Sequence, residues 1–318
     1  MTTVCNHGNY LVEAVTFASS RLQLAGTLHV PDRPTGLLPA VVILGPFAYV
    51  KEHAPLQYAT RLADEGIVTL AFDCSHHGES AGEPRRLEEP LRKVADVRAA
   101  VDFLASRPEV DSDRVAGLGI GEGAAEMLRA AVEDERVRGV VAISGTYRDH
   151  ENDVVHAGGD GLRTGRIAAS DAQRLLAERV GRARAALERF EDVDEVDYLP
   201  VVDPVRDDVA LPGREAWEWY SGRAGRGLWE NRYAVMGDVA YLGFESLSAA
   251  RELAVPVLMV HGEHSDGPSA ARRHLEAVTK APKRLVSDAG TSHYDYFDDP
   301  SVIDRTVATV APWVRGGS

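Results

Sequence analysis

The 318-residue chain carries 49 acidic and 35 basic side chains, giving a net charge of −14, and its length allows one large domain or a core with an insertion. This acidity, with no basic cluster, argues against nucleic acid and against a membrane surface as partners. Two cysteines are too few for a disulfide framework, and no signal peptide or membrane-spanning run is apparent, so we expect a cytoplasmic protein, with a homodimer left open.

Strand and helix patterns alternate along the chain, which is typical of an α/β fold with a mostly parallel sheet. Residues 12–17 and 22–30 are expected to open the sheet as an antiparallel pair. Short apolar runs predict buried strands at 40–44, 67–72, 115–120, 140–143, 255–261 and 283–286. Amphipathic patterns predict helices at 57–65, 89–104, 124–132 and 302–314.

The stretch between Tyr147 and Ser248 differs in character from the rest of the chain. It is rich in charge and lacks buried-strand runs, and apolar residues at 172–190 recur every three or four positions, as in an amphipathic helix. We therefore assign residues 1–147 and 249–318 to the core and 148–248 to a mainly helical cap. Ligands of parallel sheets bind at the carboxyl ends of the strands, where such a cap would lie.

The turn after the predicted strand 115–120 has an unusual composition. It runs Gly119-Ile120-Gly121-Glu122-Gly123, which matches the nucleophile elbow Gly-x-Ser-x-Gly except at its centre. The two flanking glycines, which let strand and helix approach each other, are present. Gly121 stands where the serine nucleophile belongs, so we expect no covalent serine chemistry.

The same turn also fits the dinucleotide-binding pattern Gly-x-Gly-x-x-Gly/Ala. That interpretation needs an acidic residue at the end of the next strand to hold the ribose, whereas here strand 139–143 ends in Ser144-Gly145-Thr146. The pattern also normally follows the first strand of its domain. We therefore expect no nucleotide cofactor, and no spacing of His, Cys or Asp indicates a metal site.

Several motifs, in chain order, resemble those of the α/β-hydrolase superfamily, in particular its bacterial dienelactone-hydrolase-like branch. Asp73-Cys-Ser-His-His-Gly-Glu-Ser-Ala-Gly-Glu-Pro-Arg85 is similar to the branch's Asp-x-Ser-x-x-Gly-Glu-Ser-x-Gly-x-Pro-Arg segment, and Lys51-Glu52 resembles the pair after its oxyanion loop. Asn231–Met236 resembles a motif at the end of the cap, and Gly290–His293 resembles the loop of the catalytic histidine. The resemblance implies an α/β-hydrolase fold, with a mostly parallel central sheet flanked by helices and a helical cap insertion.

The resemblance also implies where acid–base groups lie. His293 follows the last core strand, where the histidine of a Ser-His-Asp triad is found. Its acidic partner is expected at Asp266 by position, with Glu263 as the alternative. Such a pair can act as general base or acid without a nucleophile. The Glu122 carboxyl, beside the elbow, could be a desolvated acid–base group or a plain complement to the helix dipole.

The family's oxyanion loop commonly reads His-Pro-Gly-Gly-Gly, whereas the matching stretch here is Gly45-Pro46-Phe47-Ala48-Tyr49. The wall of the site is therefore expected to be apolar and aromatic at this point. The backbone N–H groups of Phe47 and Glu122 could still form an oxyanion hole, because backbone donors do not depend on the side chain. Candidate pocket residues are Tyr49, His76, Trp217 and Tyr233; the cap aromatics could equally form the core of the cap.

Three functions are compatible with these residues. The first is an enzyme without a serine nucleophile that performs non-hydrolytic acid–base chemistry on a carbonyl-rich small molecule, such as cyclisation, C–C bond formation, elimination or isomerisation in natural-product biosynthesis. The second is a hydrolase in which His293 activates water against an ester or lactone. The third is a non-catalytic small-molecule binding protein. Retention of His293 and Asp266 favours the two enzymes, since a binding protein has no need of them.

Overall fold

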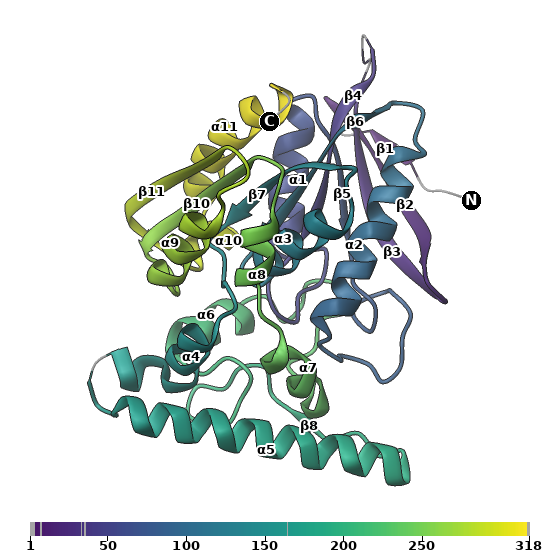
Figure 1. The fold of residues 1–318 in the computed structure, drawn as a ribbon. Helices are drawn as coiled ribbons and strands as arrows, with labels where there is room; N and C mark the ends of the chain where they lie inside the picture. Colours follow the sequence, from purple (N-terminus) through teal and green to yellow (C-terminus); the bar gives the residue numbers. More distant parts are fainter. Residues whose placement is uncertain (1–3, 7, 33, 35, 164, 317–318) are drawn as a thin grey trace.

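In a computed structural model of the chain, the structure describes residues 4–6, 8–32, 34, 36–163 and 165–316. Within these residues a nine-stranded sheet forms the centre of the molecule, in the order β1-β2-β3-β5-β4-β6-β7-β10-β11 (Figure 1). Its strands are β1 (Val4–Asn6), β2 (Tyr10–Ser19), β3 (Leu22–Pro31), β4 (Leu38–Leu44), β5 (Val68–Phe72), β6 (Val110–Ile120), β7 (Val137–Ile143), β10 (Val257–His264) and β11 (Lys283–Ser292).

The sheet begins antiparallel and continues parallel. β1 pairs with β2, β2 with β3 and β3 with β5 in antiparallel fashion, whereas the pairs from β5 through β4, β6, β7 and β10 to β11 are parallel. The predicted antiparallel opening pair and the predicted mostly parallel sheet are therefore confirmed. The flanking helices are α1 (Ala54–Asp64), α2 (Pro90–Ala105), α3 (Gly123–Glu133), α8 (Leu247–Glu252), α9 (Pro268–Ala277), α10 (Asp295–Asp298) and α11 (Pro300–Arg315).

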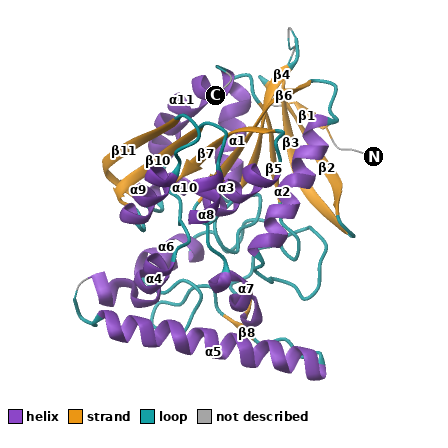
Figure 2. Cartoon of the chain, viewed as in Figure 1, coloured by secondary structure: helices purple, strands orange, loops and turns teal. Residues whose placement is uncertain are grey.

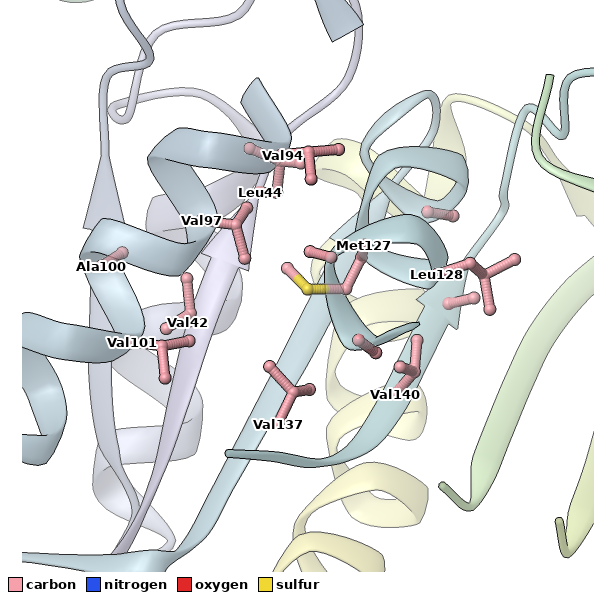
Figure 3. Packing of buried hydrophobic residues seen from close by; sticks show 14 of the residues in the cluster. Val42, Leu44, Val94, Val97, Ala100, Val101, Met127, Leu128, Val137 and Val140 are labelled. Atoms are coloured by element: carbon pink, nitrogen blue, oxygen red, sulfur yellow. The ribbon is translucent and has the colours of Figure 1, made fainter. Parts of the chain in front are cut away.

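Both faces of the central strands β4, β5 and β7 are buried, as their continuous apolar runs predict, whereas β2 and β11 are largely half-buried or exposed. Successive residues of β4 point to opposite faces: Val42 and Leu44 join one hydrophobic cluster, and Val41 and Ile43 join the other. Figure 3 shows the first cluster, in which α2 and α3 pack over β4, β6 and β7. Burying a side chain of this size contributes roughly 1.5–3 kcal/mol, so the two clusters hold the strand ends in fixed positions.

The segment between β7 and α8 lies beyond one end of the sheet (Figures 1 and 2). Its described residues add no strand to the large sheet. They form α4 (His150–Arg163), α5 (Ala169–Val193), α6 (Arg214–Ser221), α7 (Asp238–Gly243), a 3-10 turn at Val235–Gly237 and a two-stranded sheet of β8 (Tyr198–Leu199) and β9 (Tyr233–Ala234). We call this segment the cap.

The helix predicted at 172–190 corresponds to α5, but it is more exposed than its apolar pattern suggests. Of its 25 residues only Ala172, Ala183 and Ala186 are buried. The helix runs along the outer side of the cap (Figure 1). It contacts the rest of the cap through these alanines, through an ion pair between Arg179 and Asp238, and through the partly buried Leu187 and Phe190. Among the described residues, no helix is long and apolar enough to cross a bilayer.

Candidate active site

The carboxyl ends of the parallel strands bring distant segments together beneath the cap. The ends of β4 and β6 lead into the Gly45–Val50 loop and the elbow turn, Gly119–Gly123. The ends of β7, β10 and β11 lead to Ser144, Asp266 and His293, respectively. This edge of the sheet is where ligands of open parallel sheets bind.

The elbow turn has the predicted strand–turn–helix geometry. Gly121 has a φ of +59°, and its carbonyl accepts hydrogen bonds from the N–H groups of Ala124 (3.1 Å) and Thr146 (2.9 Å). A Cβ at Gly119 would lie 2.2 Å from the Gly123 carbonyl oxygen. Gly119 therefore lets β6 and α3 approach closely, and Gly123 lets α3 approach the end of β4, where a Cβ would lie 2.6 Å from the Leu44 and Gly45 carbonyl oxygens.

The space above Gly121 is largely filled. A Cβ at this position would lie 2.9 Å from Pro46 Cβ and 3.1 Å from Phe297 Cζ. The Phe297 ring also packs against the His293 ring, with 4.7 Å between centroids. An aromatic ring therefore contacts both His293 and the position at which a nucleophile would stand.

Glu122 turns its side chain back toward the oxyanion loop. Its Oε2 accepts a 2.9 Å hydrogen bond from the Phe47 N–H, and its Oε1 accepts one of 3.2 Å from the Tyr241 hydroxyl of the cap. The Glu122 side chain is buried, and hydrogen bonds to a carboxylate are stronger than those to a neutral oxygen. The Phe47 N–H, expected as an oxyanion-hole donor, is therefore occupied by Glu122.

A second buried carboxylate holds the next residue of the loop. Ala48, with a φ of +49°, donates its N–H to Glu88 Oε1 at 2.7 Å. The Lys93 ammonium group lies between two buried carboxylates. Its Nζ is 2.5 Å from Glu88 Oε2 and 3.6 Å from Glu126 Oε1 on α3. Burial raises the pKa of Glu126 to about 8 although Lys93 opposes this. Burial also disfavours ionisation of Glu88, but Lys93 and His77 together outweigh burial through charge and hydrogen bonds and lower the pKa of Glu88.

His293 is buried, and its two ring nitrogens have different partners. Nδ1 lies 2.9 Å from Ser144 Oγ, and Nε2 lies 3.9 Å from Asp266 Oδ2, beyond hydrogen-bond distance. The structure thus brings Asp266 near His293, but places a serine where we expected the carboxylate to hold the ring. The alternative acid, Glu263, is exposed and pairs instead with Arg272 and Ser287.

Ser144 was not among the predicted site residues. It is fully buried, has a φ of +44°, and its hydroxyl lies 2.9 Å from Ser265 Oγ as well as near His293. The sequence did contain a signal, because a polar residue directly after a buried parallel strand lies at the ligand-binding edge. In the sequence, Ser144 bore only on the expected absence of a nucleotide-binding site.

A cavity of about 360 Å³ lies between the cap and the core. Ser265, Asp266 and Tyr294 form part of its core wall, and His156 and Tyr241 part of its cap wall. Burial lowers the pKa of His156, and its Nε2 has no hydrogen-bond partner among the described residues. The cavity therefore adjoins the Asp266 side of the site, while Phe47, Gly121, Glu122 and His293 are not on its wall.

None of the four predicted pocket residues lines this cavity. The Tyr49 hydroxyl points into the core, where it donates to the Phe72 carbonyl at 3.0 Å, and His76 Nδ1 lies 3.0 Å from the Pro84 carbonyl. The Tyr233 hydroxyl donates to Asp238 at 3.0 Å, and Trp217 packs on a hydrophobic cluster shared by cap and core. Here the aromatics contribute to packing.

Among the described residues, no group of three or more His, Cys, Asp or Glu side chains is placed to hold a metal ion. The polar groups at the strand ends are instead hydrogen-bonded to one another, as with Glu122 and Phe47 or Ser144 and His293. What the arrangement offers chemically is a set of buried proton donors and acceptors beside a cavity.

Comparison with known proteins places this geometry in a family. The model of the alpha/beta hydrolase family matches residues 41–305. The uncharacterised protein PA2218 of Pseudomonas aeruginosa is 31% identical over 293 residues, covering 89% of this chain and 75% of that one. The PA2218 crystal structure has a TM-score of 0.79, with 26% identity and coverage of 98% and 95%, respectively.

Two further likenesses are more distant. The polyketide transferase claH of Penicillium crustosum is 25% identical over 278 residues, covering 80% of this chain and 81% of that protein. The dienelactone hydrolase of Anabaena variabilis shares the fold, with a TM-score of 0.55, 16% identity, and coverage of 96% and 97%. The chain therefore belongs to the α/β-hydrolase family and shares its fold with a dienelactone hydrolase.

Proposed function

We propose that this protein is an enzyme that transfers protons on a carbonyl-containing small molecule without forming a covalent intermediate at the elbow turn. The observation that carries the proposal is the hydrogen bond from the Phe47 N–H to Glu122. In acyl transfer a nucleophile attacks the carbonyl carbon, and N–H donors stabilise the charge that develops on its oxygen. The elbow turn supplies no nucleophilic side chain, and its neighbouring N–H donor is taken.

Acid–base chemistry requires neither a nucleophile at the elbow turn nor a free Phe47 N–H. If one group removes a proton from the carbon beside a carbonyl while another donates one to the oxygen, no full negative charge develops. Two titratable groups lie close behind the cavity wall: Glu122 reaches it through Tyr241, and His293 through Asp266. Such an arrangement suits cyclisation, C–C bond formation, elimination or isomerisation.

The likeness to claH supports the choice of substrate class. A polyketide is a chain bearing repeated carbonyl groups, so a polyketide transferase handles carbonyl-rich small molecules. At 25% identity we carry over this class and not the reaction. The substrate we propose is accordingly a carbonyl-rich natural-product intermediate, of a size that fits the 360 Å³ cavity.

The second candidate function is hydrolysis by water that His293 activates. It is favoured by the proximity of His293 and Asp266, which would support an imidazolium ion. Attack by water still produces a tetrahedral intermediate with charge on the oxygen, and the Phe47 N–H is not free to stabilise it. We therefore rank hydrolysis below proton transfer.

A 3-oxoacyl thioester of N-acetylcysteamine separates these functions, because one molecule contains an acidic carbon and a labile acyl bond. We expect the wild-type protein in D2O to accelerate deuterium uptake at C2 above the buffer background, as measured by NMR, without releasing thiol. Thiol release that depends on His293 would identify a hydrolase. Saturable binding of the thioester with neither reaction would identify a binding protein.

A variant at Glu122 tests the observation on which the proposal rests. Glu122→Ala frees the Phe47 N–H, so thiol release should first appear in this variant. Glu122→Gln is the matched control, because the amide oxygen can still accept the hydrogen bond from Phe47. Equal thiol release by the wild type and Glu122→Ala would contradict the role given to this contact.

A further inference from the structure

A chain of hydrogen-bonding groups connects the cavity to His293. Ser265 lies on the cavity wall, its Oγ accepts a 2.9 Å hydrogen bond from the Ser144 hydroxyl, and Ser144 Oγ is 2.9 Å from His293 Nδ1. Ser144 and Ser265 are 0% and 5% exposed, so bulk water does not compete for these contacts. We call Ser265, Ser144 and His293 the hydroxyl chain.

The backbone holds Ser144 in place for this contact. Its φ of +44° belongs to the left-handed region, which residues other than glycine rarely adopt and which is found most often at functional sites. Its N–H donates to the Val260 carbonyl of β10 at 2.8 Å. Ser144 therefore bridges β10 and the loop after β11, with its hydroxyl directed at His293.

The two nitrogens of His293 have roles opposite to those in a Ser-His-Asp triad. In a triad the carboxylate binds Nδ1–H and leaves Nε2 as the base. Here the Asp266 carboxylate lies 3.9 Å from Nε2, where it favours a proton on Nε2. Nδ1 is then the nitrogen with the free lone pair, and Ser144 is its neighbour.

We propose that Ser144 and Ser265 relay a proton between the ligand and His293 Nδ1, so that the acid–base centre lies at the Ser265–Asp266 wall. This inference rests on the proposed function. The hydrogen bond from Ser144 to Ser265 has the direction of the acid step: the imidazolium ion gives its Nδ1 proton to Ser144 Oγ, Ser144 gives its own to Ser265, and Ser265 gives its own to the ligand. The ring is left neutral with its proton on Nε2, both hydroxyls turn round, and the reverse sequence is the base step.

The walls of the cavity indicate how a ligand would be oriented. The core wall presents the polar groups of Ser265, Asp266 and Tyr294. The cap side is mixed: leucines such as Leu176 and Leu242 line it together with charged side chains such as Arg148, Asp153 and Arg179. The ligand that fits is a small molecule with apolar and polar parts, whose oxygen-bearing, reactive end faces Ser265.

The tautomer of His293 tests the hydroxyl chain without any substrate. In protein labelled with ¹⁵N-histidine, at a pH where the ring is neutral, we expect the wild type to have its proton on Nε2. Ser144→Ala, which keeps the Cβ, should shift the Nδ1 resonance and mix the tautomers. Ser269→Ala, at an exposed serine that also lines the cavity, should leave the spectrum unchanged. A wild-type ring protonated on Nδ1, or a spectrum unaffected by Ser144→Ala, would overturn the proposal.

Thiol labelling tests whether the outer end of the chain faces the cavity. In a Cys5→Ser background, N-ethylmaleimide should label Ser265→Cys in the folded protein and leave Ser144→Cys unlabelled. Cys74, which is fully buried, serves as the internal standard for an inaccessible thiol. An unlabelled Ser265→Cys in a folded protein would refute the proposed access. Neither measurement uses turnover, so failure of the proposed function in the thioester assay remains distinguishable from failure of this inference.

Discussion

The two ends of the site, which a conventional triad would join, differ sharply in this protein. At the elbow end, Pro46 and Phe297 fill the space above Gly121, and the Phe47 N–H donates a hydrogen bond to Glu122. At the other end, Ser265 and Asp266 border a cavity of about 360 Å³. The elbow end is packed like a core, and the Asp266 end has room for a ligand.

This difference shows what can follow the loss of a nucleophile. A strained turn without its side chain leaves a space, and protein interiors tolerate few empty spaces. Here Pro46 and the Phe297 ring fill it. In the function that we propose, the acid–base groups act without a nucleophile at Gly121, and His293 contacts Ser144.

The largest effect on activity is expected at His293. His293→Ala should lower the rate of C2 deuterium exchange in the thioester by about two to four orders of magnitude, the usual contribution of a general acid–base group. Binding of the thioester should change little, because the cavity wall supplies most of the contacts. His264→Ala is the control, since His264 is exposed and lines the same cavity. Full exchange in His293→Ala would make Glu122 the principal base.

A smaller effect is expected at Asp266. Asp266→Asn should lower the exchange rate on the order of tenfold, because a half-exposed carboxylate 3.9 Å from Nε2 acts through a screened interaction. The KM for the thioester should stay close to that of the wild type. A loss as large as that of His293→Ala would show that Asp266 holds the ring more tightly in solution than the 3.9 Å separation indicates.

The packed elbow end predicts an effect on stability. Gly121→Ala should lower the free energy of unfolding by about 1–3 kcal/mol, since alanine at a φ of +59° is strained and its Cβ would press on Pro46. Gly181→Ala, in the middle of α5 where a Cβ meets nothing within 4 Å, should be neutral or stabilising. Chemical denaturation measures both. An unchanged stability for Gly121→Ala would mean that the elbow end is more open than described.

The buried charges behind the elbow predict a dependence of stability on pH. Burial raises the pKa of Glu126 to about 8 in the folded protein, against 4.5 for an unperturbed glutamate. The folded state therefore retains a proton that the unfolded state loses, and the contribution of Glu126 to stability falls between about pH 4.5 and pH 8. Glu126→Gln should flatten this decline in urea denaturation. A decline equally steep in the variant would assign it to other groups.

The sequence predicted the scaffold well because burial patterns determine it. Apolar runs such as 40–44 indicate buried strands, and both interpretations of the elbow glycines require a strand–turn–helix connection. The positions of His293 and Asp266 were implied by the resemblance to α/β-hydrolases. The directions of loop side chains do not follow from such patterns. The Tyr49 side chain points into the core, and the Glu122 side chain points back to Phe47. Both orientations depend on contacts between segments far apart in the sequence.

Ser144 was not predicted for the same reason, because burial patterns do not specify the directions of loop side chains. Its role depends on a left-handed backbone and on the positions of two other strand ends, neither of which is visible in periodicity. The exposure of α5 is a related case, because an apolar stripe does not specify how much of it a partner covers. Sequence patterns located the edge of the sheet that carries the site, and three-dimensional contacts decided which residues there face the cavity.

The most direct test of the central claim is labelling with a fluorophosphonate probe, which forms a stable adduct with activated serine nucleophiles. The wild-type protein should remain unmodified when a serine esterase, treated in parallel as the positive control, is fully labelled. Mass spectrometry of the intact protein and of its peptides gives the extent and the position of any adduct. Stoichiometric labelling at Ser144, Ser265 or any other serine would show that the protein has a covalent nucleophile after all, and would contradict a mechanism based on proton transfer alone.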